Sequence, residues 1–205
     1  MNEYHSPKQE LDALRLAAER QDRNACWDAT RKLLHRLPAK LALRFSQEFV
    51  ARRLPAFERH QPGVSWPREF IEAISGTGTA TDRRTWPEAE DDFAGPGANS
   101  FTSAVEALWK AGRFTEDEQR RSELLADAIV GAINAERLEY WGSQHPDMWA
   151  LWYQLVSTGL NDPRITEIQI TIMKDPGAMR VERAAWSEAI QHLEEALSAS
   201  THEPH

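Results

Sequence analysis

Apolar residues recur at helical spacing along most of the chain, and the densest example is the segment 146–158, PDMWALWYQLVST. At ~100° per residue, one face of a helix here carries Trp149, Trp152, Tyr153 and Val156. Leucines occupy the other side, and a helix that is apolar nearly all round is typical of a buried element. The segment is therefore predicted to be the central helix of a tryptophan-rich core. The indole N–H groups of Trp149 and Trp152 are expected to be hydrogen-bonded.

Residues that favour the first turn of a helix divide the rest of the chain into a series of predicted helices. A capping side chain followed by proline, or by Glu or Gln three residues later, suits the free backbone N–H groups of a helix start. The predicted starts are Ser6, Asp22, Pro38, Ser65, Asn99 or Ser100, Thr115, Pro146, Asp162 and Asp175. They predict an all-α fold, with residues 1–205 forming a single-domain bundle of about eight helices and residues 199–205 a frayed tail.

Prolines and glycines predict where several of these helices end. Pro55 is expected to kink or end the helix that starts at Pro38, because proline removes a backbone donor, while Phe57 is expected still to pack. Gly142 is expected to end the longest helix of the chain.

The segment 165–173, ITEIQITIM, fits two structures. Ile165, Ile168 and Ile172 have helical spacing, whereas Ile168, Ile170 and Ile172 alternate as in a strand. A single strand would have no partner elsewhere in the chain. The segment is therefore predicted to be helical.

Residues 76–100 form the longest irregular segment and contain the densest acidic run. Acids at the start of a short helix would explain Glu88 and Glu90, but not every acid of the run. An acidic loop beside an aromatic side chain is also typical of a protein-binding surface. We therefore expect a partner-binding loop over Thr85–Phe93, with contacts from Trp86, Glu88, Glu90, Asp91 and Asp92.

Composition narrows the class of protein. A chain of 205 residues with 41% hydrophobic and 27% charged side chains is typical of a globular domain with a sizeable core. No apolar run approaches the ~20 residues of a membrane-spanning helix, and the first residues do not resemble an export signal. Cys26 is the only cysteine, so no intrachain disulfide forms. These features favour the cytoplasm.

The charge of the chain is acidic and uneven. The net charge is −8, which argues against nucleic acid as a main partner. Residues 1–60 carry 12 basic and 8 acidic side chains, whereas residues 61–205 carry 12 and 24. This pattern fits either solvated helix faces of differing sign or an acidic surface that meets a basic protein partner.

Motifs for metal or covalent chemistry are weak. The seven histidines form no HExxH motif, and Glu188 with His192 lacks the second pair that a helical di-metal site needs. Cys26 stands beside Trp27 without an activating motif, so it is expected to pack and not to act as a nucleophile. No cofactor is expected.

Two acidic pairs offer an alternative, Glu123 with Asp127 and Glu136 with Glu139. All-α nucleotide pyrophosphatases hold magnesium with such pairs on adjacent helices, which would make the chain a metal-dependent enzyme for a small phosphorylated or nucleotide substrate. Here all four carboxylates lie on one predicted helix, with Glu136 ~220° around from Glu123, so they would not converge.

Glu136 and Glu139 also fall on the inward side of that helix. Buried carboxylates need a partner, which an arginine or a tryptophan N–H would provide. The other possibility, which we prefer, is that this end of the helix has already reached solvent.

Residues 42–73 carry a partial resemblance to a known family. The residues concerned are Ala42-Leu43-Arg44, Leu54-Pro55-Ala56-Phe57-Glu58, Pro67-Arg68 and Ile71-Glu72-Ala73. They resemble the helical immunity proteins of bacterial polymorphic-toxin systems, in which a similar Leu-Pro-x-Phe-Glu helix end precedes a Pro-Arg helix start. The resemblance implies a small cytoplasmic helical protein that neutralises a toxin by binding it, and it implies no catalytic residues. A non-enzymatic interaction protein with a protein partner, such as a basic toxin domain, is the function we expect.

Overall fold

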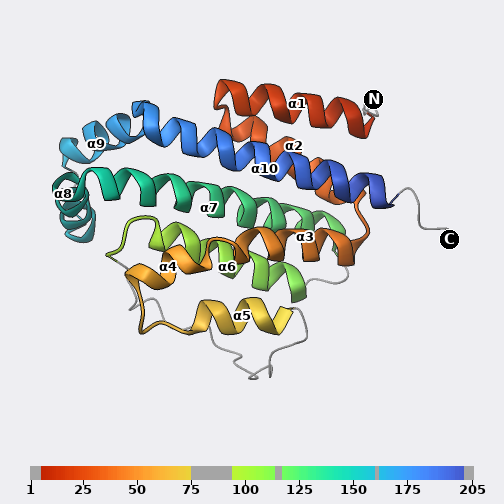
Figure 1. Ribbon diagram of the computed structural model, residues 1–205, viewed down its shortest axis with the longest axis horizontal. Helices are drawn as coiled ribbons and strands as arrows, with labels where there is room; N and C mark the ends of the chain where they lie inside the picture. The colour runs from red at the N-terminus through yellow and green to blue at the C-terminus, as the bar shows by residue number, and fades with distance from the viewer. Residues whose placement is uncertain (1–5, 75–93, 114–116, 160–161, 201–205) are drawn as a thin grey trace.

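A computed structural model describes residues 6–74, 94–113, 117–159 and 162–200, and these residues form ten α-helices and no strand (Figure 1). The helices are α1 (Pro7–Arg20), α2 (Arg23–Arg36), α3 (Ala39–Ala51), α4 (Leu54–His60), α5 (Trp66–Ile74), α6 (Ala98–Arg113), α7 (Glu118–Gln144), α8 (Pro146–Ser157), α9 (Pro163–Lys174) and α10 (Pro176–Ser200). The predicted all-α fold is confirmed for the described residues, with ten helices where about eight were predicted, and the segment 165–173 is helical.

Capping side chains start several helices where the sequence predicts them. Ser6 and Gln9 form a reciprocal capping box at α1, with Ser6 N donating to Gln9 Oε1 over 2.7 Å. Asp22 accepts from the backbone at the start of α2, and Asp162 and Asp175 do the same at α9 and α10. These starts depend on residues close in sequence, so local pattern is enough to place them.

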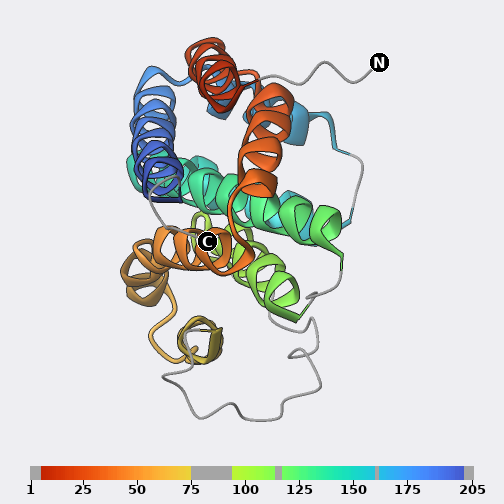
Figure 2. The same cartoon turned by 90° about the vertical axis from the view of Figure 1, so that its right-hand side faces the viewer.

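The helix α7 is the central element of the bundle (Figure 2). It runs between α1, α2 and α10 on one side and α3 and α6 on the other, and it packs directly against α2, α3, α6 and α10. Its buried side chains include Leu125, Ile129 and Ile133. The main hydrophobic cluster therefore forms around α7, and the prediction that the segment 146–158 is the centre is wrong.

The helix α8 instead lies at one end of the molecule, at the left of Figure 1, against α9 and the end of α7. Only Trp149 and Leu155 are buried in it, Trp152 is partly buried, and Val156 is 44% exposed. A helix is buried on all sides only when neighbouring helices surround it, and α8 is covered only where it packs against α9 and the end of α7. Both indole N–H groups were predicted to be hydrogen-bonded. The Trp149 N–H does donate to Ala94 O over 2.8 Å, but the buried Trp152 N–H has no partner among the described residues.

Two glycines allow close packing, and one of them, Gly142, was predicted to have a different role. Gly142 does not end α7, which continues to Gln144, and a Cβ at Gly142 would lie 2.5 Å from Pro96 Cβ. Gly97 has φ +75°, and a Cβ there would lie 2.2 Å from Ala135 O. Both glycines thus allow the segment before α6 to approach α7 closely.

Four other boundaries differ from the prediction. Pro55 lies in the first turn of the new helix α4, where its missing N–H costs nothing, and Phe57 is buried as expected. The helix α6 starts at Ala98, ahead of Asn99 and Ser100, and the cap of α7 is Asp117, while Thr115 lies outside the described residues. The last helix reaches Ser200, into the predicted tail.

Among the described residues, no helix combines the length and apolar character needed to cross a membrane.

Candidate functional site

The predicted partner-binding residues are Trp86, Glu88, Glu90, Asp91 and Asp92, and they lie in the segment 75–93, outside the described residues. Their role stays a prediction. The structure does place the four carboxylates of the alternative metal site and two further regions with functional potential.

The four carboxylates all lie on α7, and each is bound by a different side chain. Glu123 accepts from Arg120 over 3.1 Å, and Asp127 accepts from Trp27 Nε1 over 2.7 Å. Glu136 accepts from Arg53 and Glu139 from Arg59, at 3.1 and 2.7 Å. At 1.5 Å rise per residue, positions 123 and 136 are ~20 Å apart along the axis, so the two pairs do not converge. Within the described ranges, no group of three or more potential metal ligands forms.

Arginine partners also explain why Glu136 and Glu139 face inward. The Glu139 side chain is 19% exposed and Glu136 is 37% exposed, so both are partly covered. The expectation that this end of α7 simply reaches solvent is wrong. The partners were hard to anticipate because Arg53 is 83 residues away from Glu136 in the sequence.

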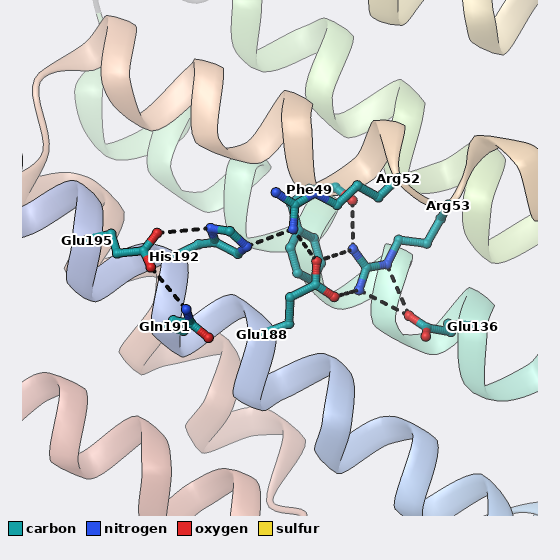
Figure 3. A network of polar contacts seen from close by, with 8 residues as sticks. All are labelled: Phe49, Arg52, Arg53, Glu136, Glu188, Gln191, His192 and Glu195. Carbon is teal, nitrogen blue, oxygen red and sulfur yellow. Dashed lines mark hydrogen bonds and ion pairs between the residues drawn. The ribbon is translucent and has the colours of Figure 1, made fainter.

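Arg53 is the centre of a charged network between α3, α7 and α10 (Figure 3). Its side chain is 6% exposed, and it donates to Glu188 over 2.8 Å and to Phe49 O over 2.9 Å, as well as to Glu136. The guanidinium carbon also lies 3.8 Å from the Phe49 ring centroid. Burial favours the neutral form of Glu188, but hydrogen bonds from Arg53 and Arg52 hold the pKa of this carboxyl below its usual value.

Arg52 extends the network to the imidazole of His192. Its Nη1 atom donates to Glu188 over 2.6 Å and lies 2.7 Å from His192 Nε2. Because arginine only donates, Nε2 accepts, which leaves the proton of the neutral ring on Nδ1. That atom lies 3.4 Å from Glu195 Oε2 (Figure 3).

A cavity of about 310 Å³ opens beside this network, between α4, α7 and the start of α6. Its apolar wall includes Phe57 and Phe101, and its polar wall contains Arg52, Arg53, Arg59, His60, Glu136, Glu139 and Glu188. Each of the three carboxylates already binds an arginine of the same cavity. The charges therefore largely neutralise one another, and the cavity favours neither an anion nor a cation.

The second region is apolar and lies on α8 and α9. Five large apolar side chains are exposed among the described residues, and four of them are Leu151, Val156, Ile170 and Met173 on these two helices. The fifth, Leu16, lies on α1. We call Val156, Ile170 and Met173, together with the partly buried Trp152 and Tyr153, the α8–α9 face, whereas Leu151 lies on the other side of α8.

A small separate hydrophobic cluster supports this face. Trp141, Trp149 and Leu155 are buried in it together with Ile168 and Ile172 of α9. Trp149 and Trp152 pack with ring centroids 4.9 Å apart. The face thus rests on a packed layer and not on loose side chains.

The isoleucine pattern of 165–173 could have indicated the exposed apolar side of α9 from the sequence alone. Alternating isoleucines in 165–173 are compatible with a strand, but on a helix they point in opposite directions. Ile168 and Ile172 are buried, and Ile170, ~200° from Ile168, is 44% exposed. A helix with apolar residues on two opposite sides has one side available to a partner.

Cys26 is packed, as expected. It is 1% exposed, and burial raises the pKa of its thiol to about 12, with a smaller contribution from Glu182. A thiol with such a pKa stays protonated near neutral pH and is a poor nucleophile.

Comparison of the chain with models of known protein families, with curated proteins and with solved structures gave no match.

Proposed function

We propose that the chain is a non-enzymatic cytoplasmic binding protein of the immunity or inhibitor type, which neutralises a toxin by binding it. The observation that carries this proposal is the α8–α9 face, which holds three of the five exposed large apolar side chains of the described residues, Val156, Ile170 and Met173. Exposed large apolar side chains that gather on two neighbouring helices mark a candidate protein-binding surface.

The composition of the face suits a protein interface. Trp152 and Tyr153 provide partly buried aromatic rings, and Val156 lies on the same side of the helix. Aromatic side chains supply a large share of interface binding energy when the partner removes them from water. The packed layer beneath α8 reduces the ordering that binding would require.

The net charge of −8 supports a basic partner. Charge of one sign speeds the approach of a partner of the other sign, while the apolar contacts provide affinity. This division of roles also keeps the predicted acidic loop, with Glu90, Asp91 and Asp92, as part of the proposed interface.

The alternative of a metal-dependent enzyme gains no support from the site geometry. Glu123, Asp127, Glu136 and Glu139 are distributed along α7, and each already binds a donor side chain. Calorimetric titration with magnesium tests this alternative directly, since a site of that kind would give saturable binding.

The α8–α9 face is tested by first searching the genes beside that of this chain for a basic toxin domain and then using that domain as the partner. Co-expression should protect cells from the toxin, and calorimetry should show binding. The double variant Ile170→Asp/Met173→Asp should weaken binding at least ~10-fold, which corresponds to ~1.4 kcal/mol, because it places charge in an apolar contact.

The matched control is Leu16→Asp, which changes the exposed leucine of α1 and should leave binding unchanged. Circular dichroism should show that both variants remain folded. Equal binding by the double variant and the parent would show that the α8–α9 face is not the interface.

A further inference from the structure

The outer side of α9 has a charge pattern that is complementary to itself. Ile170 is exposed at its centre, and Glu167 and Lys174 are exposed one turn before and one turn after it. At ~100° per residue, these two charged side chains are only ~20° apart, on the same flank of Ile170. Met173 lies on the other flank and is 57% exposed.

This pattern matches an antiparallel copy of the same helix. A twofold axis that passes midway between positions 170 and 171 exchanges positions 167 and 174 on the same flank. Each glutamate then faces the lysine of the other copy, and the two Ile170 side chains meet near the axis. A parallel pair would place the charged flank against the Met173 flank, so only the antiparallel pair joins opposite charges.

We propose that two copies of this chain associate through antiparallel α9 helices. The inference rests on the proposed function, because it gives the α8–α9 face a second occupant that competes with the toxin. Self-association covers Ile170 and Met173 while the toxin is absent, and toxin binding releases the dimer.

The size of the contact sets its strength. The helix α9 has 12 residues, which makes it ~18 Å long. A typical stable interface buries ~800 Å² on each partner, and one short helix provides less. We therefore expect a weak dimer, with a dissociation constant in the micromolar range or above.

Sedimentation equilibrium of the full chain tests the proposal over protein concentrations from roughly 10 µM to 1 mM. The parent should shift from monomer to dimer. Lys174→Glu should weaken the dimer about tenfold, because the substitution creates two like-charge contacts per dimer. The double variant Glu167→Lys/Lys174→Glu should restore association, since it exchanges the charges without changing the pattern.

Leu16→Asp is the control and should associate like the parent. A parent that stays monomeric throughout the range would overturn the proposal, as would a charge-exchanged variant that stays as weak as Lys174→Glu. Toxin binding is measured separately on dilute, monomeric protein. A failed dimer with intact toxin binding therefore contradicts only the inference, and a dimer without toxin binding contradicts only the proposed function.

Discussion

The cluster around α7 and the cluster under α8 and α9 both contain buried tryptophan, but different kinds of side chain border them at the surface. In the cluster around α7, Trp186 is 2% exposed, and buried charges at the margin are paired, as in Arg53 with Glu188. In the small cluster, Trp141 is fully buried, yet exposed apolar side chains such as Val156 and Met173 lie on the same two helices, beside exposed charges such as Glu167. Paired charges at the border of a cluster favour contact with water, whereas exposed apolar side chains favour contact with another protein. The contrast separates the part that holds the fold from the part that we propose as a binding surface.

The largest expected effect is in the cluster around α7. Trp186→Ala should lower the free energy of unfolding by about 3–5 kcal/mol, because the ring is buried and its neighbours would only partly fill the cavity. Urea denaturation measures the change. A loss below ~1 kcal/mol, which is typical of surface sites, would contradict the assignment of α7 and α10 to the stable part.

An intermediate effect is expected at the paired margin. Arg53→Met should cost about 2–3 kcal/mol, because Glu188 and Glu136 stay partly buried without their shared partner. Arg44→Met is the control, since its ion pair with Glu48 is largely exposed, is screened by solvent and should contribute far less. Equal effects of the two substitutions in urea denaturation would show that the network does not stabilise the margin.

The smallest of the three effects is expected in the small cluster. Trp152→Ala should cost about 1–2 kcal/mol, since Trp152 is only partly buried and its N–H group has no hydrogen bond to lose among the described residues. The same denaturation experiment measures it. A cost of 3 kcal/mol or more, the range of full burial, would mean that this cluster is as closed as the one around α7.

Helix type and several helix starts follow from short-range pattern, which is why the sequence predicts them. Asp22, Asp162 and Asp175 cap backbone groups two or three residues away, and no distant residue is needed. The sequence also favours a helix for 165–173, because a single strand would have no partner.

Contacts between distant residues explain the parts that the sequence did not predict. Gly142 looks like a helix end until Pro96, 46 positions earlier, is known to pack on it. The apolar segment 146–158 looks like a core until its place at the end of the bundle is known. Likewise, the pairing of Arg53 with Glu136 and Glu188 depends on how α3, α7 and α10 meet.

The length of α10 has a practical consequence for binding experiments. It starts beside α9 and ends at the opposite end of the bundle, where α1 also begins (Figure 1). With 25 residues it is ~37 Å long, so a tether attached after its last turn would hold the α8–α9 face far from a sensor surface. Immobilising the chain through that end would leave the face open to a partner, whereas a label on α8 would block it.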